Sequence, residues 1–224
     1  MSKFARRNSL GLFFGAIFLA SLLGQAIAGW QQFNDDQFAG HLARISLPDY
    51  LGSANFAADV AENWQSEFLQ FLLYIVATVW LLQRGSPESK ELDKAGLESD
   101  QDQKVGEYSD ASSPRWAAAG GLRTTLYSWS LSVLMGAIFF ASWFAQSLGG
   151  WGSFNESRFQ RMQDPITWVA YLTNADFWAR TLQNWQSEFL AVASMAAFAI
   201  YLRQRGSPES KLVGAPHQAT AEDP

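Results

Sequence analysis

Apolar residues are concentrated in four segments of the chain, and polar stretches separate them. Two of these segments, Leu10–Ala28 and Leu126–Gly149, are long enough for a helix that crosses a bilayer, which needs about 20 apolar residues. The other two, Phe68–Leu82 and Phe189–Leu202, are shorter. They reach a spanning length only if each helix includes the polar residues that precede it. The pattern therefore predicts spans at about 10–28, 64–83, 126–149 and 185–203.

The segment from Ser9 to Lys90 recurs, without a gap, as Ser130 to Lys211, and about 36 residues are identical between the two copies. Each copy contains GW-x-x-FN-x-x-x-F, then NWQSEFL, then QRGSPESK. Because each copy holds two spans, the chain returns to its starting side before the second copy begins. The expected fold is an all-α membrane protein with four transmembrane helices, arranged as two parallel tandem repeats of a helical hairpin.

The repeats divide the chain into four regions. Residues 1–90 form the first two-span repeat, and residues 126–211 form the second. Between them, residues 91–125 are acidic and rich in Ser, Gly and Asp, which is typical of a flexible, solvated linker. Residues 212–224 have a similar composition and are predicted to be a disordered tail.

The distribution of basic residues predicts the orientation. Of the 16 Lys and Arg residues, 12 flank the predicted spans on one side, and the two loops between spans hold only Arg44, Arg158, Arg161 and Arg180. Since Lys and Arg favour the cytoplasmic side, both termini and the linker are expected there, and both inter-span loops outside. The basic start, apolar core and Ala26-Ile-Ala28 also resemble a cleavable signal peptide. Retention of the first span is favoured, because its copy lies in the middle of the chain.

Local signals predict where the returning helices begin and end. Gly85 followed by Pro87 is typical of a helix stop, and the same residues recur in the second QRGSPESK. Ser53 and Asn174 are suitable N-caps for helices that contain the NWQSEFL septet. Gly29-Trp30 and Gly150-Trp151 are expected to end the first and third spans at the outer interface. The phenylalanines that follow predict either amphipathic segments on the membrane surface or a folded cap.

Polar residues near the outer ends of the spans form the candidate site. Asn63 precedes Glu67 by four residues, so both lie on one helix face. Unpaired polar groups in hydrocarbon cost several kcal/mol, so burial of all such residues together is expected. The predicted cluster comprises Glu67, Glu188, Asn63, Asn184, Gln25, Gln146, Ser21 and Ser142.

This cluster has two interpretations. The first is polar contacts that set the register of the helices. The second is a proton- or cation-responsive site at Glu67 and Glu188, which would make the protein a small transporter or channel. The first is favoured because the polar stripe does not continue: Gln70 and Tyr74 are replaced by Ala and Met in the second copy. A non-enzymatic structural or accessory bundle is therefore the expected function.

Residues typical of catalysis or cofactor binding are sparse. The chain has no Cys and only two His, and it lacks HExxH, GxSxG and Gly-rich phosphate loops. We therefore expect no enzyme activity, no cofactor and no metal site. No basic tract is dense enough for nucleic acid, so the expected partners are the lipid bilayer and a second copy or another membrane protein. QRGSPESK is explained as a helix stop and topology signal, or alternatively as a cytoplasmic docking motif.

With NWQSEFL, QRGSPESK and the tandem repeat, the chain resembles a family of small bacterial integral membrane proteins known only as a domain of unknown function. Ser113-Pro-Arg-Trp116 in the linker and Val213-Gly-Ala-Pro-His217 in the tail also carry this likeness. The resemblance implies a multi-pass protein of the bacterial inner membrane. It implies nothing about a substrate.

Overall fold

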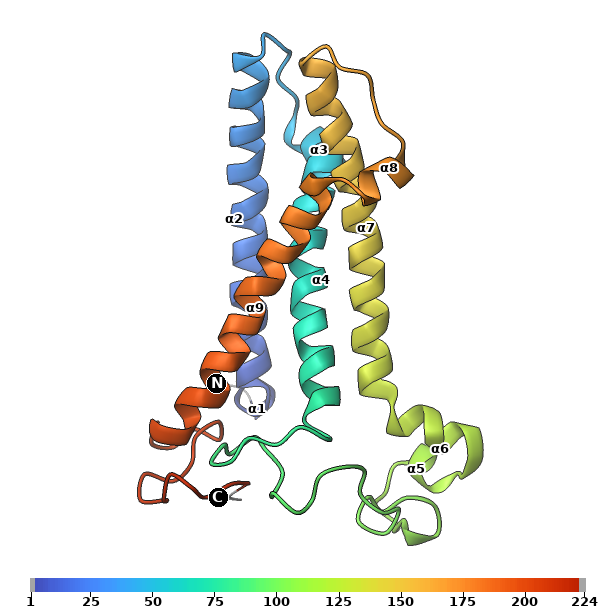
Figure 1. The fold of residues 1–224 in the computed structure, drawn as a ribbon, viewed down its shortest axis with the longest axis vertical. Coiled ribbons are helices and arrows are strands. Elements are labelled where there is room, and N and C mark those ends of the chain that lie inside the picture. The colour runs from blue at the N-terminus through green and yellow to red at the C-terminus, as the bar shows by residue number, and fades with distance from the viewer. Residues whose placement is uncertain (1–2, 222–224) are drawn as a thin grey trace. The chain divides into compact units, whose positions relative to one another are not determined.

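The computed structural model describes residues 3–221 and is all-helical in that range, which confirms the predicted all-α class (Figure 1). Residues 1–2 of the predicted first repeat and residues 222–224 of the predicted tail lie outside the described residues. The elements are α1 Lys3–Arg7, α2 Ser9–Ala39, α3 Leu47–Leu51, α4 Ala54–Ala77, η1 Gly106–Tyr108, α5 Arg115–Ala118, α6 Gly121–Ser128, α7 Ser130–Gln160, α8 Trp168–Leu172 and α9 Ala175–Tyr201.

Only α2 and α7 are long and apolar enough, among the described helices, to qualify as membrane spans by length and composition. The sequence predicts four spans, and α4 and α9 do not meet this criterion. Their N-terminal halves carry charged residues, such as Asp59 and Glu62 in α4 and Asp176 and Arg180 in α9. In addition, α4 ends at Ala77, six residues before the predicted end of its span.

The predicted helix starts agree with the structure better than the predicted helix ends do. Ser53 Oγ accepts the N–H of Phe56 at 3.2 Å, and Asn174 Oδ1 accepts the N–H of Asp176 at 2.9 Å, so both predicted N-caps are confirmed. The prediction that the Gly-Trp pairs end the odd spans is wrong. Instead, α2 continues nine residues past Trp30, and α7 continues nine residues past Trp151.

The chain divides into two compact units. Unit 1 comprises Met1–Ala61 and Phe144–Phe177, and unit 2 comprises Glu62–Trp143 and Trp178–Pro224. Each unit contains residues from both sequence copies. The units therefore differ from the regions that the repeat predicts.

Two buried tyrosines organise unit 1. Tyr50 in α3 packs against Phe33 of α2, with ring centroids 5.6 Å apart, and is 2% exposed. Tyr171 in α8 packs in the same way against Phe154 of α7, at 5.5 Å, and is fully buried. Gly29 leaves room for the hydroxyl of Tyr50, which it contacts closely. A glycine inside α2 thus admits an aromatic ring instead of ending the helix.

The GW-x-x-FN motif closes the loop that follows each long helix of unit 1. Trp30 Nε1 donates to the carbonyl of Ile45 at 2.8 Å, and Asn34 both accepts from the Ile45 N–H and donates to its carbonyl. Trp151 and Asn155 repeat these bonds on Ile166. Of the two alternatives left open by the sequence, these contacts favour a folded cap over free surface segments.

Helices α4 and α7 approach each other closely within unit 1. A Cβ atom built on Gly149 would lie 2.8 Å from the backbone N of Ala58 and 2.9 Å from the carbonyl O of Ala54. A Cβ atom on Gly152 would lie 2.8 Å from that of Ala54. Glycine at these two positions lets the helix backbones come together, as small residues do in membrane bundles. A Cβ atom built on Gly24 of α2, by contrast, would meet no atom of another segment within 4 Å.

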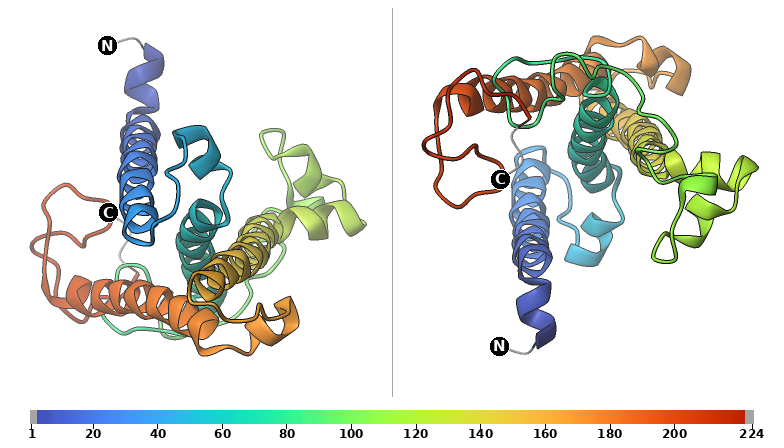
Figure 2. Two further views of the ribbon diagram at one scale, coloured as in Figure 1. Left: turned by 90° about the horizontal axis from the view of Figure 1, so that it is seen from above. Right: turned by 90° about the horizontal axis from the view of Figure 1, so that it is seen from below.

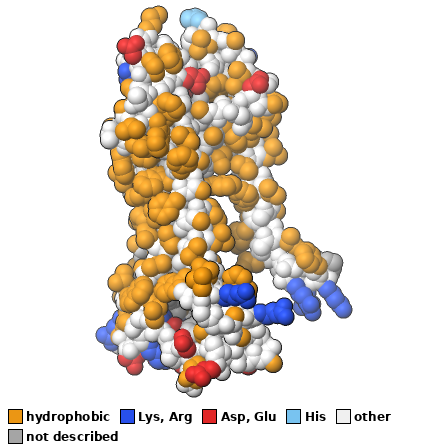
Figure 3. All heavy atoms as spheres, turned by 90° about the vertical axis from the view of Figure 1, so that its right-hand side faces the viewer, with side chains coloured by type: hydrophobic (Ala, Val, Ile, Leu, Met, Phe, Trp, Pro, Cys, Tyr) orange, Lys and Arg blue, Asp and Glu red, His pale blue; other side chains and the backbone are white. Residues whose placement is uncertain are grey.

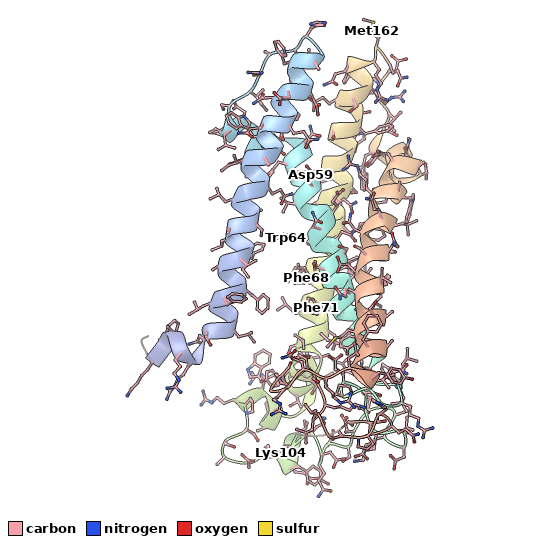
Figure 4. All side chains as sticks on the ribbon, turned by 90° about the vertical axis from the view of Figure 1, so that its left-hand side faces the viewer. Asp59, Trp64, Phe68, Phe71, Lys104 and Met162 are labelled. Atoms are coloured by element: carbon pink, nitrogen blue, oxygen red, sulfur yellow. The ribbon has the colours of Figure 1, made fainter. Side chains whose placement is uncertain are left out.

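Unit 2 contains the C-terminal parts of α4 and α9, the start of α7, and the connecting segments. The ring of Trp143 contacts the rings of Trp178 and Trp185, with centroids 6.1 and 5.9 Å apart. In the linker, α5 and α6 pack side by side (Figure 2). Trp64, Phe68 and Phe71 follow one another along α4 at helical spacing (Figure 4).

Apolar side chains are widely exposed on the described helices. In α2, Leu10, Phe13 and Leu19 each leave more than 60% of their surface uncovered. Hydrophobic side chains cover much of the face drawn in Figure 3. Soluble monomers rarely expose apolar patches on this scale, whereas lipid-facing helices do so routinely.

Candidate functional site

The predicted polar cluster is divided between the two units. Ser21, Gln25 and Gln146 belong to unit 1, and the other five residues belong to unit 2. The structure buries Ser142 and Gln146, half-buries Gln25, Asn184 and Glu188, and exposes Ser21, Asn63 and Glu67.

The NWQSEFL septet of α4 turns a different face inward from the one that the sequence predicts. Gln65 and Ser66 are the buried members, at 0% and 1% exposure, while Asn63 and Glu67 are exposed. Gln65 lies four and seven positions from the buried residues Ala61 and Ala58, which places all three on one helical stripe. A helix cannot bury this stripe and the Asn63–Glu67 face equally.

The septets of the two repeats meet in unit 2 through Trp185 and Gln65. Trp185 Nε1 donates to Gln65 Oε1 at 2.7 Å. The negative charge of Glu67 acts on the half-buried carboxyl group of Glu188, although Glu67 itself is exposed. Asn184, however, donates to the carbonyl of Arg180 in its own helix at 3.0 Å. The amide group of Asn184 therefore makes a hydrogen bond to the backbone of its own helix.

A pocket in unit 2, which we call the repeat pocket, was not identified from the sequence. Its volume is about 330 Å³, and its lining is mainly apolar. All of its lining residues are pairs that occupy equivalent positions in the two copies: Gln70 with Ala191, Phe71 with Val192, Tyr74 with Met195, and Glu88 with Glu209. The pocket therefore lies where the two repeats face each other within unit 2.

Two carboxyl groups occupy one side of the repeat pocket. Glu88 is half-buried, accepts a hydrogen bond from the hydroxyl of Tyr74, and lines the pocket together with Glu209. Burial, followed by the interaction with the side chain of Glu209, raises the pKa of Glu88. The position of Glu88 beside a second carboxyl group therefore favours its protonated form.

The serines of QRGSPESK position these glutamates. Ser89 Oγ accepts the N–H of Gln83 at 2.9 Å, and Ser210 Oγ accepts that of Gln204 at the same distance. Gly85 supplies the left-handed turn in the first copy, with φ of 85°. The motif is therefore a closed loop that presents its glutamate, which explains why its serines recur.

The lysine that ends each motif fixes the segment that follows it. Lys211 is 3% exposed, and its Nζ donates to carbonyls of the first loop and of the tail, including Gly85 at 2.7 Å and His217 at 3.0 Å. Lys90 donates to the carbonyl of Gly96 at 2.8 Å. The sequence predicts a disordered tail, but in the structure residues 212–221 pack on the first QRGSPESK loop.

A second polar group in unit 1 also escaped the sequence analysis. Glu156 of α7 accepts hydrogen bonds from Gln37 of α2 at 3.2 Å and from Asn55 of α4 at 3.3 Å. Gln37 and Glu156 occupy variable positions of the two GW-x-x-FN-x-x-x-F motifs, and Asn55 follows the N-cap Ser53 by two residues. The contact depends on three helices meeting, so no local sequence pattern could reveal it. Within residues 3–221, no group of three or more His, Cys, Asp or Glu side chains is placed to hold a metal ion.

Comparison with known proteins identifies the family. A family model described as a domain of unknown function, DUF6766, matches residues 1–222. The chain belongs to the DUF6766 family. No curated protein and no solved structure matches it. Membership of DUF6766 confirms the expected uncharacterised family. The description of this family assigns no activity.

Proposed function

We propose that this DUF6766 protein is a non-enzymatic structural or accessory protein of the bacterial inner membrane, with its long helices embedded in lipid. The observation that carries the proposal is the apolar surface of α2 and α7, both of which have the length and composition of membrane spans. Only a small part of the apolar window of α2, 6%, is buried against protein. Lipid is the environment in which such a surface is stable.

We further propose that α4 and α9 cross the same bilayer, giving four spans with both termini in the cytoplasm. Downstream of its polar first turns, α4 exposes Phe71 and Leu73, and α9 exposes Leu190 and Phe198. The predominance of Lys and Arg in the segments outside the hairpins supports this orientation.

The hydrogen bonds of the repeated motifs support a structural role. Trp30 and Asn34 bind the backbone of Ile45, and Ser89 binds the backbone of Gln83. Motifs whose polar groups are used in this way hold the fold together. The assembly formed in the membrane would use a second copy or another membrane protein.

Reporter fusions test the topology. With four spans, a fusion at Gly106 lies in the cytoplasm and one at Thr173 lies outside. If only α2 and α7 cross, the fusion at Gly106 lies outside and the fusion at Thr173 lies in the cytoplasm. A fusion at Gly52 lies outside in both arrangements. An external Gly106 together with an internal Thr173 would refute the four-span proposal, and release of the protein from membranes by high salt would refute the membrane proposal itself.

A second function, a small transporter or channel, has one observation in its favour: the proximity of Glu67 and Glu188 in unit 2. Paired carboxylates in a membrane protein are a common feature of ion and proton pathways. The double variant Glu67→Gln/Glu188→Gln separates the two functions. Loss of ion flux with intact assembly favours transport, whereas loss of assembly alone favours the structural role.

A further inference from the structure

We propose that the repeat pocket of unit 2 binds an organic ammonium ion with an apolar body, its cationic group held by Glu88 and Glu209. The pocket has a volume of about 330 Å³, which is within the range of small-molecule sites. This inference goes beyond the structural role proposed above, because a membrane bundle needs no ligand.

The lining of the pocket matches both parts of such a ligand. Phe71, Val192 and Met195 provide an apolar wall. The aromatic rings of Phe71 and Tyr74 add faces of the kind that attract quaternary and protonated amines. The two carboxyl groups provide negative charge next to this wall, so a ligand with an apolar body and a single positive charge is complementary to the pocket.

The charges around the carboxyl pair leave it available for a cation. Glu88 is held by Glu209 and Tyr74, and neither carries a positive charge. Three basic side chains of the two loops are engaged elsewhere: Arg84 with Gln218, Lys90 with Glu98, and Lys211 with backbone carbonyls. The fourth, Arg205, is exposed and does not line the repeat pocket. No basic side chain lines the repeat pocket, so a bound ammonium group would neutralise negative charge of the two carboxyl groups.

The donor set favours an organic cation over a metal ion. Ca²⁺ requires six to eight oxygen ligands, and Mg²⁺ requires octahedral coordination. The repeat pocket offers two carboxyl groups, a phenol and one amide, surrounded by apolar atoms. An ammonium group does not require a fixed number or geometry of oxygen ligands, and contact with the apolar wall stabilises the apolar body attached to it. Such a group could belong to a free amine or to the headgroup of an aminolipid.

Methionine NMR provides a direct measurement. The chain has four Met residues, and Met195 lines the pocket, so its ¹³C-labelled methyl group reports occupancy, with Met195→Leu to assign its signal. Full-length protein in a neutral maltoside detergent is titrated with hexyltrimethylammonium. We expect a saturable shift of the Met195 signal alone, and no saturable shift with hexyl sulfate, which has the same tail and the opposite charge.

Variants decide whether the carboxyl groups are responsible. Glu88→Gln/Glu209→Gln should weaken binding by at least about tenfold, because it removes the charge and preserves the shape. Ala191→Phe keeps both carboxyl groups, fills the cavity, and should abolish binding even if the double variant folds poorly. The exposed Glu107→Gln in the linker is the matched control and should bind normally. An absent shift, an equal response to hexyl sulfate, or undiminished binding by both pocket variants would overturn the proposal.

Nanodiscs distinguish the two sources of the ammonium group. In discs of phosphatidylglycerol alone, no lipid amine competes with the probe. If adding phosphatidylethanolamine reduces the apparent affinity for hexyltrimethylammonium, the natural ligand class is an aminolipid headgroup. Equal affinity in both discs assigns the site to a free amine. The topology fusions are independent of all these measurements, so failure of either proposal is recognised separately.

Discussion

Replacement of Gly149 by Ala tests the close approach of α4 and α7 in unit 1. The added methyl group would lie 2.8 Å from the backbone N of Ala58, 2.9 Å from the carbonyl O of Ala54 and 3.1 Å from the Cα of Ala58. These three atoms belong to the backbone of α4, so they cannot rotate away. To accept the methyl group, the helices must separate, and contacts along the interface must lengthen.

Two effects of opposite sign determine the outcome. Overpacking a well-packed contact costs about 1–3 kcal/mol. Alanine is a better helix former than glycine by about 1 kcal/mol, which partly offsets this cost. Gly24→Ala isolates the second effect, because no other atom lies within 4 Å of the added methyl group. The difference between the two variants should therefore be about 1–3 kcal/mol, with Gly149→Ala the less stable.

Unfolding by dodecyl sulfate in mixed micelles, followed by tryptophan fluorescence, measures this difference. A further control is Ala28→Gly, the equivalent position in the first copy, where the alanine is exposed. This substitution should lower the free energy of unfolding only through the weaker helix propensity of glycine. Equal free energies of unfolding for Gly149→Ala and Gly24→Ala would show that the two helix backbones do not approach as the structure describes.

Three further predictions follow from the loops. Because the raised pKa of Glu88 favours its protonated form in the fold, this stabilisation is complete at acid pH and is lost as pH rises through the raised pKa. Glu209→Gln, which removes the neighbouring charge, should flatten the decline in unfolding midpoints measured between about pH 4 and pH 8; an unchanged slope would contradict this. Lys211→Met removes the ammonium group that joins the tail to the first loop, so hydrogen exchange at the Gly85 amide should accelerate at least about tenfold, whereas unchanged protection would exclude this role. Asn34→Ala leaves a backbone N–H without its partner and should lower the free energy of unfolding by about 1–3 kcal/mol, against no change if the loop is free.

Helix starts could be predicted from the sequence, and helix ends could not. Ser53 and Asn174 cap the helices that follow them through bonds to residues two or three positions away, and such local chemistry is visible in the sequence. The continuation of α2 past Gly29 depends on Tyr50, which packs against that glycine from a separate helix. A tertiary contact thus decides whether the Gly-Trp pair ends a helix.

The candidate site illustrates the same division. Equivalence of Glu88 and Glu209 is evident from the repeat, but their proximity depends on how the two loops fold. In the sequence, the replacement of Gln70 and Tyr74 by Ala191 and Met195 in the second copy favours a structural role over a transport path. In the structure, these residues and their replacements line one pocket, so the difference between the copies is part of its chemistry.

Divergence between the copies makes the two carboxyl groups of the pocket unequal. Tyr74 donates a hydrogen bond to Glu88, whereas Met195, its equivalent, has no hydrogen to donate to Glu209. The tail packs on the first loop and leaves the second open, so Glu88 is half-buried and Glu209 exposed. The more deeply placed Glu88 is therefore also the one with a fixed hydrogen-bond donor. In the proposed site, a cation from solvent would therefore meet the exposed Glu209 before the half-buried Glu88, so the two copies of one motif would have different roles.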